Sequence, residues 1–176
     1  MWDSMAGSFG GFRLPDFEED SFLEILAKKN MLSPESLVLD VGCGAGKYAL
    51  AIAGRCCHVT GLDLSPQMIR IAQQKMREYH IENADFSCRD WHSMDIERAG
   101  YRNKFDLVFA HMTPAVQSAD TFEKLSAASR GWCVLAKPIR RTDPVSDAVK
   151  ELIGIRERRE SGDEEIVFAF ELLWRQ

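Results

Sequence analysis

The stretch that decides the fold is LVLDVGCGAGKYAL, residues 37–50. Its first residues, Leu37–Val41, form the largely aliphatic run that is typical of a strand buried on both faces. Three glycines follow at every second position: Gly42, Gly44 and Gly46. Glycine lets a ligand approach the main chain and lets the chain adopt positive φ, and a helix just beyond adds free N–H groups. The stretch therefore predicts a ligand cradle between a buried strand and a helix.

The spacing of these glycines argues against two phosphate-binding loops. A dinucleotide-binding loop has the pattern GxGxxG, and this chain has Lys47 in the place of the third glycine. A P-loop needs a Gly-Lys pair followed by Ser or Thr, which does not occur here. The GxGxG pattern thus disfavours a nicotinamide-dependent oxidoreductase.

Strand and helix patterns alternate along the rest of the chain. We expect helices at residues 20–32, 47–54, 65–80 and 119–130, and further strands at residues 58–64, 84–91, 104–112 and 131–139. The clearest helix start is Ser65 as the N-cap with Pro66 in the first turn. This alternation predicts a doubly wound α/β domain with a mostly parallel sheet and a ligand site at the carboxyl ends of the strands.

Composition and charge narrow the function further. The chain has 176 residues, 45% of them hydrophobic, and a net charge of −5 without a basic block, so we expect one domain and no nucleic-acid partner. No apolar run approaches the roughly 20 residues that cross a bilayer, so no membrane partner is expected. The five cysteines show no metal-ligand spacing, which predicts no metal site and favours a cytoplasmic location. Cys88 and Cys133 lie in apolar runs and are expected to be buried.

At four places in order the chain resembles the class I methyltransferases that depend on S-adenosylmethionine. The motifs are VLDVGCGAG, GLDLSPQMI with Asp63, CRDW with Asp90, and KFDLVFAHM, and the resemblance covers about residues 2–139. The segment WDSMAGSF, residues 2–9, is similar to an arm found in the small-molecule enzymes of that family. The resemblance implies a Rossmann-like fold, S-adenosylmethionine as cofactor with S-adenosylhomocysteine as product, and a small-molecule acceptor.

The same resemblance implies roles for individual residues. Asp63 would accept hydrogen bonds from the ribose hydroxyls, which suits a carboxylate because charge-assisted bonds are strong. Asp90 would accept from the adenine amino group, with Trp91 closing the base pocket. Asp40 would either organise the glycine loop from below or receive the amino group of the ligand. The implied cofactor-binding set is Asp40, Gly42, Cys43, Gly44, Asp63, Leu64, Met68, Asp90, Trp91, His111 and Met112.

The sequence says less about the residues that would bind the methyl acceptor. His111 ends the fourth expected strand and is the candidate general base, although it could instead only pack against the cofactor. The stretch HMTPAVQ lacks the Asn/Asp-Pro-Pro-aromatic motif of enzymes that methylate bases or glutamine, because Ala115 follows Pro114. A protein that binds S-adenosylmethionine but has lost catalysis remains the alternative.

The two ends of the chain carry further expectations. Within a single domain of residues 1–176, residues 1–19 are expected to form an arm or lid, or otherwise a disordered tail. Residues 146–160 predict a helix, and residues 163–176 a further helix or one strand. We therefore expect five or six strands and no terminal hairpin, with an exposed sheet edge that could form a homodimer.

Overall fold

The computed structural model describes residues 11–137 together with residues 145, 148–149 and 152–153. The chain divides into two compact units, residues 1–136 and 137–176, and the sheet lies in the first. Residues 1–10 of the predicted arm at 1–19 and the whole last element predicted at 163–176 lie outside the described residues, as does most of the predicted helix at 146–160. The arm, the last helix or strand and the absence of a hairpin therefore stay predictions.

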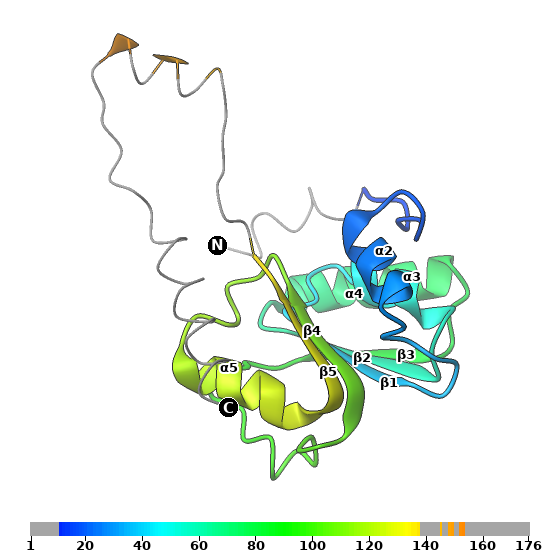
Figure 1. The fold of residues 1–176 in the computed structure, drawn as a ribbon. Coiled ribbons are helices and arrows are strands. Elements are labelled where there is room, and N and C mark those ends of the chain that lie inside the picture. The colour runs from blue at the N-terminus through cyan, green and yellow to red at the C-terminus, as the bar shows by residue number, and fades with distance from the viewer. Residues whose placement is uncertain (1–10, 138–144, 146–147, 150–151, 154–176) are drawn as a thin grey trace. The chain divides into compact units, whose positions relative to one another are not determined.

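A five-stranded parallel sheet forms the centre of the first unit, with the strand order β3-β2-β1-β4-β5 (Figure 1). The strands are β1 (Leu37–Val41), β2 (His58–Asp63), β3 (Ala84–Cys88), β4 (Phe105–His111) and β5 (Ser129–Ala136). The helices are α2 (Ser21–Lys28), α3 (Lys47–Ala53), α4 (Pro66–Glu78) and α5 (Ala119–Ala128). The predicted doubly wound α/β architecture is confirmed.

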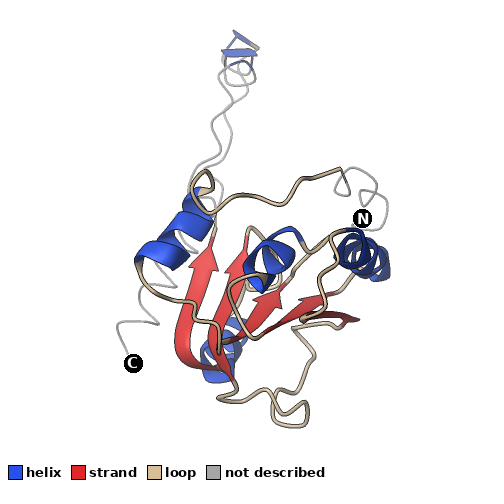
Figure 2. Ribbon diagram, turned by 90° about the vertical axis from the view of Figure 1, so that its right-hand side faces the viewer, coloured by secondary structure: helices blue, strands red, loops and turns tan. Residues whose placement is uncertain are grey.

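Helices cover both faces of the sheet, which appears in red between blue helices in Figure 2. Helices α2, α3 and α4 share one hydrophobic core with alternate residues of the strands, among them Val38, Val59, Leu107 and Phe109. Helix α5 lies on the opposite side (Figure 1). Burial on both faces explains why the central strands are continuous apolar runs.

Side-chain caps set the starts of three helices. The Asp20 carboxylate accepts hydrogen bonds from the N–H groups of Phe22 and Leu23 and so caps α2. Ser65 accepts from the Met68 N–H at the start of α4, where Pro66 is the first helical residue. Ser118 forms a capping box at the start of α5. These local signals were readable in the sequence, because a cap depends only on neighbouring residues.

Strands β3 and β5 differ from their predicted bounds by more than one residue. Strand β3 ends at Cys88 rather than at residue 91, because its described partner β2 ends at Asp63, which pairs with Cys88. Strand β5 begins at Ser129, directly after α5, where the Arg130 side chain bonds to Asp106 of β4.

The predicted burial of Cys88 and Cys133 is wrong, since both are exposed. Each lies on a strand that pairs on one side only among the described residues, β3 with β2 and β5 with β4. Trp132 of β5 is also 46% exposed. The predicted self-association through a sheet edge stays a prediction.

Candidate functional site

A cavity of about 700 Å³ opens at the carboxyl ends of strands β1 to β4. This is the edge at which open α/β sheets bind ligands. Its wall contains every residue of the implied cofactor-binding set except Asp40: Gly42, Cys43, Gly44, Asp63, Leu64, Met68, Asp90, Trp91, His111 and Met112. The sheet therefore brings together residues that are far apart in the sequence.

The glycine loop after β1 is held by hydrogen bonds to β2. The N–H groups of Gly42 and Cys43 both donate to the carbonyl of Leu62, at 2.8 and 2.9 Å. Gly42 and Gly44 have φ angles of 74° and 54°, in the left-handed region that favours glycine. A Cβ added to Gly42 would lie 2.0 Å from Oγ1 of Thr113, whereas one added to Gly44 would meet nothing within 4 Å.

Asp63 connects the end of β2 to the glycine loop. Its Oδ2 accepts a hydrogen bond from the Gly44 N–H at 2.8 Å, and its Oδ1 accepts from the Ser65 N–H at 2.8 Å. Each carboxylate oxygen has a second lone pair. The half-buried Asp63 side chain can therefore accept hydrogen bonds from a ligand in the cavity as well.

Asp90 occupies the corresponding place after β3. Its Oδ1 accepts from the His92 N–H at 3.0 Å and its Oδ2 from the Ser93 hydroxyl at 2.9 Å. The bond from Ser93 is the largest effect that lowers the pKa of Asp90, so this carboxyl is ionised at neutral pH. The neighbouring Trp91 is 3% exposed, and its indole N–H donates to the carbonyl of Thr121 in α5. Its ring is therefore fixed between the cavity and α5.

Asp40 lies under the loop rather than in the cavity wall. It is 3% exposed, and burial, reinforced by the charge of Asp63, raises its pKa well above the ordinary value, against a backbone hydrogen bond from Ala49. Of the two roles open to Asp40, the position beneath the loop agrees with that of an organising residue.

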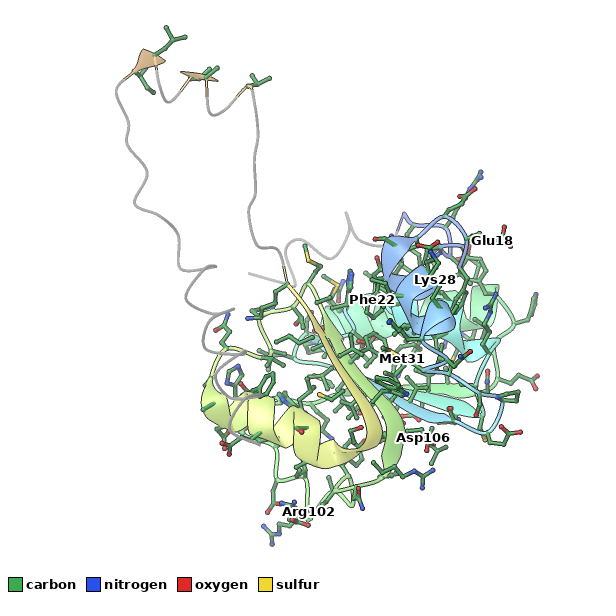
Figure 3. The ribbon with its side chains drawn as sticks, viewed as in Figure 1. Glu18, Phe22, Lys28, Met31, Arg102 and Asp106 are labelled. Atoms are coloured by element: carbon green, nitrogen blue, oxygen red, sulfur yellow. The ribbon has the colours of Figure 1, made fainter. Side chains whose placement is uncertain are left out.

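An aromatic cluster surrounds His111, which lines the cavity at the end of β4. The imidazole lies 4.1 Å from the ring of Tyr48 and 4.6 Å from the ring of Phe22, measured between centroids. Phe22, labelled in Figure 3, extends from α2 toward the sheet. Burial lowers the pKa of His111, although the charge of Asp20 opposes this shift and Lys47 adds to it. At neutral pH the imidazole is therefore mainly neutral and can accept a proton.

Tyr48 was not singled out from the sequence, yet it forms part of this cluster. Its hydroxyl donates to Oδ2 of Asp20 at 3.1 Å. Burial and the hydrogen bond to Asp20 raise the pKa of Tyr48 to about 12, so the phenol stays protonated. Phe12, Lys47 and Thr113 also line the cavity outside the implied set. The position of Lys47 and Tyr48 in the sequence could have indicated that they line the cavity, since they are the first two residues after the last glycine of the loop.

Comparison with protein families gives a match to this region. A family model described as "Methyltransferase domain" matches residues 38–131, more than half of the chain. The matched segment begins in β1 and ends in β5, and it contains all of the strand ends that form the cavity.

In the part of the chain that the structure describes, no helix has the length and apolar character needed to span a membrane.

Two curated proteins show the range of relatives. The chain is 35% identical over 78 residues to the malonyl-[acyl-carrier protein] O-methyltransferase of Acetivibrio thermocellus, which covers 43% of this chain and 25% of that protein. It is 26% identical over 125 residues to the carboxy-S-adenosyl-L-methionine synthase of Helicobacter pylori, which covers 68% of this chain and 50% of that protein. The chain therefore spans between a quarter and a half of the length of these relatives.

Among solved structures, a SAM-dependent methyltransferase from Aquifex aeolicus is similar with a TM-score of 0.63. The alignment covers 89% of this chain and 90% of that chain at 17% sequence identity. At this identity the likeness concerns the fold, which agrees with the sheet described above.

Proposed function

We propose that this chain, which belongs to the S-adenosylmethionine-dependent methyltransferase family, transfers a methyl group to a small-molecule acceptor. The observation that carries the proposal is the arrangement of Asp63 and Asp90 in one cavity, both on the β2–β3 side of a glycine loop with open space above Gly44.

The donors and acceptors of the cavity suit this cofactor. Asp63 would accept hydrogen bonds from the two ribose hydroxyls with the lone pairs that the Gly44 and Ser65 N–H groups leave free. Asp90 would accept from the adenine amino group, and the apolar side chains of Leu64 and Met68 would contact the base. Because Gly44 has no side chain, the main chain can lie against the rest of the cofactor.

When bound, S-adenosylmethionine supplies a methyl group on a positively charged sulfur, which becomes a neutral thioether after transfer. The protein's main contribution is then to orient the acceptor in line with that methyl group and to exclude water. His111, which lines the cavity at the end of β4, is the candidate base. Its lowered pKa leaves the imidazole neutral and able to take the proton of an acceptor hydroxyl. If the acceptor carries no proton to remove, His111 serves only as part of the packed wall.

Affinity for the cofactor product tests the ribose role of Asp63. We expect Asp63→Ala to lose at least about 1.5 kcal/mol of binding free energy for S-adenosylhomocysteine in calorimetry, the low end for hydrogen bonds to a charged group. Asp95→Ala is the matched control, because Asp95 also accepts two backbone N–H bonds but does not line the cavity. Equal affinities for the wild type and Asp63→Ala would show that the assignment is wrong.

A small-molecule acceptor is supported by the negative net charge of the chain, which disfavours nucleic acid. The test is to incubate the protein and labelled S-adenosylmethionine with a cell extract and to separate small molecules from macromolecules by ultrafiltration. We expect a labelled compound in the small-molecule fraction that chromatography separates from S-adenosylmethionine itself. Label retained with RNA or protein would overturn the acceptor class, and tight cofactor binding without transfer to any fraction would favour the catalytically inactive alternative.

A cytoplasmic location completes the proposal. All five cysteines of the chain are free thiols, which supports a reducing compartment. Fractionation of the source cells with an antibody to the protein tests it, and recovery outside the cytoplasmic fraction would contradict it.

A further inference from the structure

The charged side chains of the cavity wall are distributed unevenly along the sheet edge. Arg89 and Asp90 follow β3 and Asp63 ends β2, so these three lie at one end of the strand order. Lys47 begins α3, directly after the glycine loop of β1, and lines the cavity near His111. Since His111 is mainly neutral, Lys47 is the cation among the described residues that line the cavity on the side of β1 and β4.

Lys47 has no carboxylate partner in the described part of the chain. None of the ion pairs there includes it. Its ammonium nitrogen lies 5.3 Å from the ring centroid of Tyr48, and the hydroxyl of that ring is already bonded to Asp20. The Asp20 carboxylate caps α2 and accepts the Tyr48 hydroxyl, and it forms none of the ion pairs of the described residues with Lys47. A half-buried cation without a carboxylate beside it attracts an anion into the cavity.

The ligand required by the proposed function carries such an anion. S-adenosylmethionine has an adenosine at one end and, beyond the sulfur, an α-amino acid whose carboxylate is ionised at neutral pH. With the ribose assigned to Asp63 and the adenine to Asp90, the amino-acid end falls on the side of β1 and α3. The charged residue on that side is Lys47.

We propose that Lys47 binds the carboxylate of the amino-acid end of the cofactor and so distinguishes complete cofactors from nucleosides that lack this end. The inference rests on the proposed function, because it assumes the same ligand in the same cavity. It assigns to Lys47 a role for which the glycine pattern alone gives no reason.

The test compares two probes that share the adenosine group. S-adenosylhomocysteine carries the amino-acid end, whereas 5′-methylthioadenosine lacks it. We expect Lys47→Met to weaken binding of S-adenosylhomocysteine about tenfold, the ratio for roughly 1.4 kcal/mol, and to leave the affinity for methylthioadenosine unchanged. Lys47→Arg should retain most of the affinity, because it keeps the charge.

Lys104→Met is the matched control. Lys104 also lies about 5 Å from aromatic rings, 5.1 Å from Tyr101 and 5.2 Å from Phe105, but it does not line the cavity. This variant should bind both probes like the wild type.

The outcomes separate the inference from the proposed function. If Lys47→Met weakens both probes equally, or neither, the carboxylate role is overturned while cofactor binding stands. An unchanged affinity for S-adenosylhomocysteine leaves Lys47 to serve an acceptor anion instead. If the wild type binds neither probe, the proposed function itself fails.

Discussion

Replacing Gly42 by alanine should damage the fold, whereas replacing Gly44 by alanine should damage mainly ligand binding. Both glycines have positive φ, 74° and 54°, so both substitutions carry the left-handed penalty of about 1–2 kcal/mol for a residue with a Cβ. They differ in what the new methyl group meets. At Gly42 the Cβ would lie 2.0 Å from Oγ1 and 2.7 Å from Cβ of Thr113, and at Gly44 it would meet nothing within 4 Å.

The overlap at Gly42 adds the cost of overpacking, about 1–3 kcal/mol. We therefore expect Gly42→Ala to lose about 2–5 kcal/mol of unfolding free energy in urea denaturation, and Gly44→Ala about 1–2 kcal/mol. The Gly44 methyl group would instead occupy space in the cavity that Gly44 lines, so this variant should bind S-adenosylhomocysteine much more weakly while remaining folded.

A second substitution isolates the steric cause. Thr113→Gly removes all three Thr113 side-chain atoms that overlap the new Cβ, so the double variant Gly42→Ala/Thr113→Gly should lose less stability than the two single losses added together. If Gly42→Ala and Gly44→Ala are destabilised equally, or if the two changes at 42 and 113 simply add, the reasoning from the Thr113 contact is refuted.

Three further predictions concern the buried acid, the imidazole and the arm. Burial raises the pKa of Asp40 well above the ordinary carboxyl value of 3.8, so the fold loses stability as the pH rises above 3.8. Asp40→Asn should therefore increase the unfolding free energy at neutral pH and leave the affinity for S-adenosylhomocysteine unchanged. A loss of affinity would contradict this. Burial lowers the pKa of His111, so the unfolded chain binds more protons and stability falls as the pH drops below 6.5; denaturation of His111→Phe should show a flatter pH dependence than the wild type, and identical slopes would exclude this residue as the cause. Deleting residues 1–14 should raise the off-rate of S-adenosylhomocysteine in stopped-flow measurements without loss of cooperative unfolding, and an unchanged off-rate would leave these residues as a tail.

The sequence was sufficient to predict elements whose signals are local. Ser65 and Pro66 placed the start of α4, and the aliphatic run before Gly42 placed β1. The site residues at the ends of β1, β2, β3 and β4 could also be predicted, because parallel strands bring their carboxyl ends to one edge. Their positions then depended only on where each strand stops.

Contacts between distant segments could not be read in the same way. Asp20, Tyr48 and His111 form one cluster, but nothing in the sequence indicates how α2 packs against β4. The exposure of Cys88 and Cys133 likewise depends on which strands lie at the sheet edges. An apolar run identifies a strand without identifying its neighbours, so burial was assigned to both cysteines wrongly.

The position of β1 in the sheet explains how the glycine loop keeps its shape. Strand β1 pairs with β2 on one side and β4 on the other, so the loop after it can be held from both neighbours. From β2, the Leu62 carbonyl accepts two N–H bonds of the loop and Asp63 accepts a third. From the end of β4, Thr113 packs against Gly42. A loop fixed in this way loses little conformational entropy when a ligand binds, and preorganisation of this kind increases affinity without further contacts.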